Sequence, residues 1–219
     1  MFDYVDSYIE EVKRVDAVIK ALSPTTRTML DETGADMDGV LGAGPPPRNN
    51  PRYWVAAASY WAYMFSKAAN ESSTVIQVGA SQLMDAPGQE PSVTLLDWSS
   101  GNGTARFWVV RLFVEAFAAG DLIASTTAAS SGGDGIGTSA VHAMGFAALD
   151  GGKRSILLIN KRNAWATVST SCGASACSCS TYRVIDEFNG LLPAREEACD
   201  ASGVVTIAPY ATAILSIAS

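Results

Sequence analysis

The chain has 219 residues, of which 48% are hydrophobic and 17% charged, and its formal net charge is -7 at pH 7. This apolar content is enough for a folded core and excludes a disordered chain. The negative charge argues against nucleic acid or an anionic membrane as partner, because their phosphates would be repelled. Charged and polar residues also interrupt every apolar run before the roughly 18 residues that span a bilayer. A neutral ligand is the easier partner.

The first half of the chain alternates helix and strand patterns. Apolar residues recur at three- and four-residue steps over 3–22, which predicts an amphipathic helix that ends at Ser23-Pro24. Further elements are predicted in this order: a strand over 26–32, a largely apolar helix over 52–70, a strand over 74–84 and a helix over 103–118. Helices between successive strands imply parallel strands with helices packed on them.

The second half has a different pattern. The Gly- and Ser-rich residues 130–139 predict a flexible connection. Short alternating or β-branched runs then follow between turn signals, at residues 140–149, 154–160, 164–170, 181–188, 204–208 and 212–217. Runs of this length and spacing predict an antiparallel β-sandwich. The chain is therefore expected to contain an α/β domain over 1–120 and an all-β domain over 121–219.

Four cysteines lie in the second half, at Cys172, Cys177, Cys179 and Cys199. Two disulfides between neighbouring loops, free thiols and a zinc site are the three alternatives. The Cys-x-Cys spacing, without a second close pair or a nearby histidine, fits zinc poorly, so no metal site is expected. Asn70 and Asn102 begin glycosylation sequons, and with the cysteines they favour a secreted or endomembrane location, although the N-terminus has no signal-peptide pattern.

Two carboxylates, Asp31 and Glu32, end the predicted strand over 26–32. One interpretation is an ordinary strand end, where acidic residues and a glycine form a turn. The other is a catalytic carboxylate at the carboxyl end of a strand. Adjacent side chains on a strand point to opposite faces, so only one of the two is expected to face a site.

Several segments together resemble a known family. These segments are TRTMLDETG, YWVAAASYWAYMF, VIQVGASQLMDAPGQEPSVTLLDWSSGNGTARFWVVRLFVEAF, ILLINKRN and YATAILSI. In this order they resemble the C-terminal part of the retaining glycoside hydrolases of clan A. That clan includes β-xylosidases, β-glucuronidases and heparanase-like enzymes. The resemblance implies the last strand-helix units of a (β/α)₈ barrel followed by a β-sandwich. A whole barrel needs about 250 residues, so residues 1–120 are expected to form an incomplete one, preceded by a missing N-terminal segment.

The resemblance also implies roles for three residues. Glu32 matches the nucleophile at the end of the seventh barrel strand, while the acid/base residue of the fourth strand has no counterpart in this chain, so the chain alone is expected to be inactive. Gln82 is a candidate for binding a sugar hydroxyl, or simply a polar strand end. Trp98 is a candidate for stacking on a sugar ring, or for capping the barrel end. The implied partner is a glycoside or oligosaccharide, and no cofactor is expected.

Other polar residues are interpreted as structural. His142 alternates with apolar residues in a β pattern and is expected to pack in the fold. Asp186, Glu187, Glu196 and Glu197 are expected at solvated edges of the sandwich. The alternative to an enzyme segment is a non-catalytic carbohydrate-binding or interaction module built on the β-sandwich.

Overall fold

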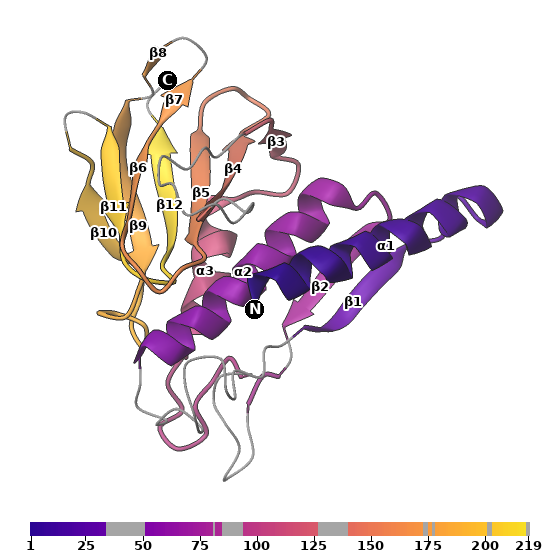
Figure 1. Ribbon diagram of the computed structural model, residues 1–219, viewed down its shortest axis with the longest axis horizontal. Coiled ribbons are helices and arrows are strands. Elements are labelled where there is room, and N and C mark those ends of the chain that lie inside the picture. The colour runs from indigo at the N-terminus through magenta and orange to yellow at the C-terminus, as the bar shows by residue number, and fades with distance from the viewer. Residues whose placement is uncertain are drawn as a thin grey trace.

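The computed structural model describes residues 1–33, 51–80, 82–84, 94–126, 140–172, 175–176, 178–200 and 203–217 (Figure 1). The predicted connection over 130–139 and Cys177 lie outside the described residues. The described residues form three helices, α1 Phe2–Leu22, α2 Pro51–Glu71 and α3 Ala105–Ala116. All three helix predictions are confirmed, with ends that differ by at most two residues.

The first two strands form a two-stranded parallel sheet, as their order with the helices predicts. Strand β1 is Thr28–Thr33 and β2 is Val75–Ala80. The predicted strand over 74–84 is too long, because β2 ends at Ala80 and Met84 forms only an isolated bridge with Leu96.

A six-stranded antiparallel sheet follows, in the order β10-β9-β12-β5-β4-β3. Its strands are β3 Leu122–Ala124, β4 Val141–Ala147, β5 Arg154–Asn160, β9 Cys179–Ile185, β10 Arg195–Ala198 and β12 Thr212–Ile217. Two further pairs complete the described strands: β6 Ala166–Ser169 with β11 Val204–Ile207, and β7 Ser171–Cys172 with β8 Ser175–Ala176. The prediction of antiparallel β-structure in this half is confirmed.

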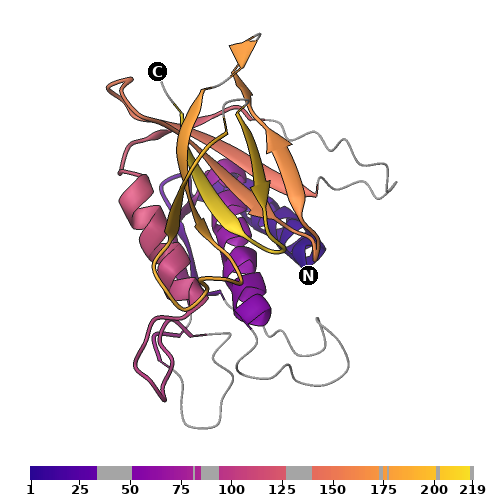
Figure 2. The same cartoon turned by 90° about the vertical axis from the view of Figure 1, so that its left-hand side faces the viewer.

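Side chains of the six-stranded sheet alternate between two hydrophobic clusters. Leu157 and Ile159 of β5 belong to the cluster shared with the helices, whereas Leu158 belongs to a second cluster with Val205 and Ile207 of β11. The sheet is therefore covered by helices on one face and by the β6-β11 pair on the other. Figure 2 shows α1 and α2 behind the sheet. The complete sandwich stays a prediction, because its second layer in the described residues is this short pair.

Helix α2 lies at the centre of the molecule and contacts α1, α3, β2, β5 and β12. Its aromatic residues Tyr53, Trp54, Tyr60 and Trp61 are buried, as the largely apolar pattern predicts. Buried Ser59 of α2 donates a hydrogen bond to the Tyr210 carbonyl and lies 2.9 Å from Thr212 Oγ1, at the start of β12. The helical segment and the sheet thus share one hydrophobic cluster, and the proposed domain boundary near residue 120 stays a prediction.

Buried Asp16 of α1 fixes the start of β2. Its carboxylate accepts hydrogen bonds from Ser72 Oγ and Ser73 N, both at 2.9 Å, and from the Thr74 hydroxyl. Burial alone would raise the pKa of Asp16, but these hydrogen bonds outweigh it and lower the pKa. Thr74 Oγ1 also lies 2.9 Å from Thr28 Oγ1, so the same group holds both parallel strands at their amino ends.

His142 of β4 packs its side chain against α2, as expected for a histidine with a structural role. Its Nε2 lies 2.9 Å from Ser66 Oγ, and its ring meets Tyr63 edge-on with centroids 4.9 Å apart. Burial, followed by the charges of Lys161 and Lys67, lowers the pKa of His142 from 6.5 to about 4, against the opposite influence of Asp6. The folded protein therefore keeps this imidazole neutral over a range in which the unfolded chain would protonate it.

We expect this histidine to make stability depend on pH. Between pH 6.5 and 4 the unfolded state binds more protons at His142, so stability falls as pH falls through this window, by roughly 3 kcal/mol. Urea unfolding of the wild type and of His142→Asn at several pH values measures the effect, since the variant retains a polar side chain without a titrating imidazole. Equal pH slopes for both proteins in this window would contradict the assignment.

Cys179 and Cys199 form a disulfide with a sequence separation of 20. It links β9 to the end of β10, which pair as antiparallel neighbours. Cys172 belongs to β7, but the structure does not describe its side chain or any part of Cys177. A disulfide between these two cysteines therefore stays a prediction.

Removing this disulfide is expected to destabilise the fold. Because a loop of this size loses about 3 kcal/mol of closure entropy in the unfolded state when it is cross-linked, Cys199→Ser should lower the free energy of unfolding by about 2 to 4 kcal/mol. Denaturant unfolding of the variant and of the wild type, each with and without reductant, measures this difference. A variant as stable as the oxidised wild type would show that the cross-link contributes nothing.

Among the described residues, no helix combines the length and apolar character needed to cross a membrane.

Candidate active site

Glu32 lies at the carboxyl end of β1, in the parallel pair. It is exposed, and so is Asp31, between buried Leu30 and buried Thr33. The simple alternation expected for Asp31 and Glu32 therefore does not hold here. The reason is an irregularity in pairing: Leu30 pairs with Val78 and Thr33 with Ala80, so β1 contains one residue more than β2 over this step. A bulge of this kind bends a strand and redirects side chains, and bulges are frequent beside active sites.

Gly79 allows the two backbones to approach at the bulge. A Cβ atom added to Gly79 would lie 2.5 Å from the Asp31 carbonyl oxygen, closer than real Cβ atoms approach other atoms. The Thr33 hydroxyl also donates a hydrogen bond to the Gly79 carbonyl. The strand end that carries Glu32 is thus held by a glycine-dependent contact and a side-chain hydrogen bond.

Arg106 of α3 holds the same end of β1 through a hydrogen bond. Its side chain is buried, with the residue 1% exposed, and Nη2 donates a hydrogen bond of 2.6 Å to the Thr33 carbonyl, one residue after Glu32. Burial lowers the pKa of Arg106 to about 10, against the opposite influence of Tyr60, so the group stays protonated at neutral pH. The sequence pattern does not reveal this role, because an arginine within ARFWVVRLF suggests only an interruption of an apolar run.

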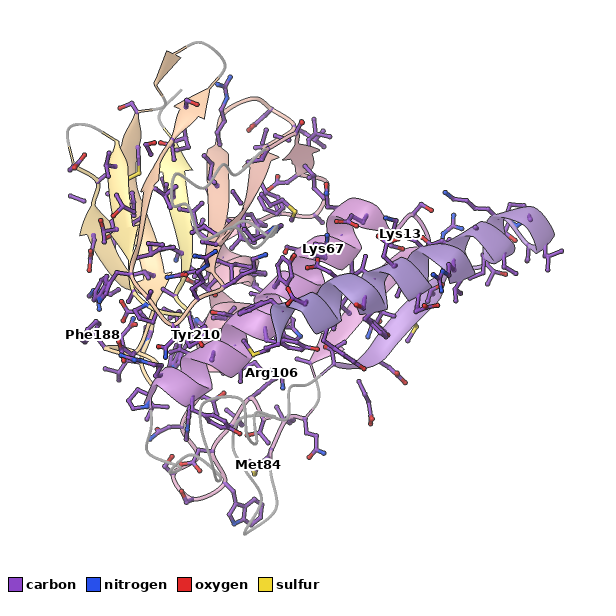
Figure 3. All side chains as sticks on the ribbon, viewed as in Figure 1. Lys13, Lys67, Met84, Arg106, Phe188 and Tyr210 are labelled. Atoms are coloured by element: carbon purple, nitrogen blue, oxygen red, sulfur yellow. A yellow bond between two sulfur atoms is a disulfide. The ribbon has the colours of Figure 1, made fainter. Side chains whose placement is uncertain are left out.

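Gln82 and Trp98 lie on two described stretches beyond β2, residues 82–84 and 94–98, which hydrogen-bond to each other. The Gln82 carbonyl accepts a hydrogen bond from Leu95 N and the Leu83 carbonyl one from Leu96 N, both at 2.9 Å. Residues 82–84 thereby run parallel to 94–96, where Met84 and Leu96 form an isolated bridge. The Gln82 side chain is exposed, and Figure 3 shows Met84 of the same segment at the lower edge of the molecule.

The turn that carries Trp98 is held by Asp97. The Asp97 carboxylate accepts hydrogen bonds from the Ser100 hydroxyl at 2.6 Å and from Ser99 N at 3.2 Å. The bond from Ser100 and those from Ser99 lower the pKa of Asp97, so its carboxylate is charged and fixed. Trp98 itself is 53% exposed, which leaves a large part of its ring available for a ligand.

Two of the three predicted site residues, Glu32 and Gln82, lie at or just beyond the carboxyl ends of the two parallel strands, and the position of Trp98 relative to them stays a prediction. Glu32 is the penultimate residue of β1, Gln82 lies two residues after the end of β2, and Trp98 follows the residues 94–96 that pair with 82–84. Carboxyl ends of parallel strands meet at one edge, which is where active sites of α/β folds are built. No group of three or more potential metal ligands occurs in the part of the chain that the structure describes.

Comparison with solved structures shows what this fold is similar to. The structure matches the catalytic domain of GH30 xylanase C from Talaromyces cellulolyticus with a TM-score of 0.59 and 13% identity, covering 89% of this chain and 41% of that one. It matches the GH51 α-L-arabinofuranosidase from Thermotoga petrophila with a TM-score of 0.65 and 13% identity, covering 98% and 48%. It matches the GH51 arabinofuranosidase from Xanthomonas axonopodis with a TM-score of 0.62 and 16% identity, covering 96% of this chain and 45% of that one.

The fold of this chain is similar to part of the fold of these glycoside hydrolases. The chain spans less than half the length of each of these three enzymes, which are TIM-barrel glycosidases. At such low identity the similarity establishes the fold alone. No family model matches the sequence, and no curated protein matches it.

Proposed function

We propose that this chain is the C-terminal segment of a retaining glycoside hydrolase that cleaves O-glycosidic bonds by double displacement, with Glu32 as the nucleophile. The observation that carries the proposal is the exposed Glu32 at the carboxyl end of a parallel strand, in a fold similar to GH30 and GH51 enzymes. The fixed backbone around it, held by Arg106 and Gly79, suits a group that must keep one orientation.

In this proposal a Glu32 carboxylate oxygen attacks the anomeric carbon, and the bond from that carbon to the glycosidic oxygen breaks. A second carboxylic acid, about 5 to 5.5 Å away, protonates the leaving oxygen and then activates the water that releases the sugar. We place this acid/base residue in an N-terminal segment outside the 219 residues, together with the rest of the barrel. Gln82 and Trp98 are proposed to contact the sugar.

The test compares two proteins on a panel of aryl glycosides that includes xylosides, arabinofuranosides and glucuronides. The 219-residue chain alone should show no turnover, whereas a longer form that includes the proposed N-terminal segment should be active. Robust turnover by this chain alone would overturn the assignment of the acid/base to a missing segment. An inactive but folded longer form would overturn the proposed activity.

The second candidate is a non-catalytic carbohydrate-binding or interaction module. The observation that favours it is the exposure of Trp165 and Phe188 on the antiparallel half of the molecule. Binding of oligosaccharide by a longer form that has no glycosidase activity would favour this candidate over the enzyme.

A further inference from the structure

Two large aromatic side chains lie together on the surface of the antiparallel half. Trp165 is 59% exposed and Phe188 is 64% exposed, yet their ring centroids are 6.2 Å apart with an interplanar angle of 31°. They come from different turns: Trp165 directly precedes β6, and Phe188 follows β9. Together these two residues form an aromatic pair.

A buried asparagine organises the turn that presents Trp165. Asn160, at the end of β5, donates hydrogen bonds from Nδ2 to the Ala164 carbonyl at 2.7 Å and to the Ala208 carbonyl at 2.9 Å. Its Oδ1 accepts a hydrogen bond from Arg162 N at 3.0 Å. The residue before Trp165 is therefore held by a side chain that is itself fully buried.

The turn that presents Phe188 is built in the same way. Buried Asn189 accepts a hydrogen bond from Asp186 N at 2.9 Å and donates to the Val184 and Pro193 carbonyls, both at 3.0 Å. The Phe188 amide donates to Asp186 Oδ1 at 3.0 Å. The expectation that Asp186 is solvated is wrong, because this turn buries its carboxylate, which pairs with Arg195 at 2.9 Å. Both aromatic side chains thus project from well-organised turns, which lowers the entropic cost of binding a ligand.

A polar group borders the aromatic pair. Arg52, in the first turn of α2, donates to both carboxylate oxygens of Glu187 at 2.8 Å and to Asn163 Oδ1 at 3.0 Å. Glu187 directly precedes Phe188, and Asn163 lies two residues before Trp165. The same arginine therefore ties the two turns together and surrounds the rings with hydrogen-bonding groups.

The aromatic pair lies toward the side of the molecule to which the carboxyl ends of β1 and β2 point. In Figure 1 the amino end of α2 and the carboxyl ends of β1 and β2 point to the same side. The turn after β9 packs on that helix end, since a Cβ added to Gly190 would lie 2.9 Å from a Val55 methyl group. Figure 3 shows Phe188 at the margin of this side, with Tyr210 and Arg106 between it and the centre.

We propose that the aromatic pair and its polar border form an accessory binding surface for a neutral polysaccharide that extends outward from the candidate active site. Exposed aromatic rings stack on the apolar faces of sugar rings, and amide, carboxylate and guanidinium groups bind hydroxyls. A purely apolar partner would desolvate the polar border without offering it hydrogen bonds, and the net charge of -7 disfavours polyanions. The ligand class rests on the proposed function, but the surface itself does not.

Affinity electrophoresis of the 219-residue chain tests the proposal. Native gels containing soluble arabinoxylan, linear arabinan or hydroxyethylcellulose should retard the wild type in at least one case. Trp165→Ala and Phe188→Ala should each weaken that binding about fivefold to tenfold, and the double variant should abolish it. Retardation by none of the three polymers would overturn the proposal.

Two matched variants show whether binding depends on this surface in particular. Tyr4→Ala removes a ring that is 67% exposed on α1 and should leave binding unchanged. Trp98→Ala removes the exposed ring of the candidate active site; if it abolishes binding while Trp165→Ala does not, the proposed surface is wrong. All variants should keep the wild-type melting temperature. Because no turnover is needed, failure of the surface leaves the prediction for Glu32 untouched, and failure of that prediction leaves the binding assay valid.

Discussion

Replacing Glu32 with glutamine in the longer, active form is expected to reduce kcat by a factor on the order of 10⁴ or more. The amide is isosteric with the carboxylate but cannot attack the anomeric carbon, so the glycosyl-enzyme no longer forms. Neither the fold nor the affinity for substrate should change much, because the Glu32 side chain is exposed and forms no part of the hydrophobic core. Steady-state kinetics with an aryl glycoside and a melting curve measure both expectations.

Asp31→Asn is the matched control, since it removes the neighbouring exposed carboxylate from the same bulge. It should retain most of the activity. A nucleophile also has signatures that a merely structural carboxylate lacks. A 2-deoxy-2-fluoro glycoside should add one sugar mass to the peptide that contains Glu32, and azide should partly restore turnover in Glu32→Ala. Labelling of another peptide would contradict the role of Glu32. A larger decrease in kcat for Asp31→Asn than for Glu32→Gln would contradict it as well.

Local patterns in the sequence predict most of the elements that build this site. The 3.6-residue periodicity of α1 and the apolar content of α2 indicate helices because each helix buries its apolar side chains. The parallel pairing of β1 with β2 follows from the helix between them. These features depend on neighbours in the sequence, so the sequence alone is enough to infer them.

The features that fix the site depend on residues far apart in the sequence. The bulge at Asp31 and Glu32 arises because Gly79 allows the backbone of β1 to come close. The buried carboxylate of Asp186 pairs with Arg195 of the next strand, whereas the segment YRVIDEF alone suggests a solvated edge. Trp165 and Phe188 meet only because β5, β9 and β12 are neighbours in one sheet. Periodicity contains no information about such contacts.

Arg106→Ala is expected to destabilise the protein by about 3 to 5 kcal/mol. The substitution removes a large side chain of a residue that is 1% exposed, leaves a cavity beneath β1, and deprives the Thr33 carbonyl of its guanidinium donor. Arg106→Met should be less damaging, because it fills much of the volume without donating a hydrogen bond. Urea unfolding of the three proteins separates the packing contribution from the hydrogen-bond contribution.

Arg111→Ala on the same helix is the control. Its side chain is 59% exposed and pairs with Glu115 at the surface, so its loss should leave the melting temperature nearly unchanged. Because the hydrogen bond from Arg106 ends one residue after Glu32, Arg106→Met should also increase amide exchange in β1 and lower kcat of the longer form more than it raises KM. An Arg106→Met variant with wild-type exchange and kcat would show that Arg106 stabilises the core without positioning Glu32.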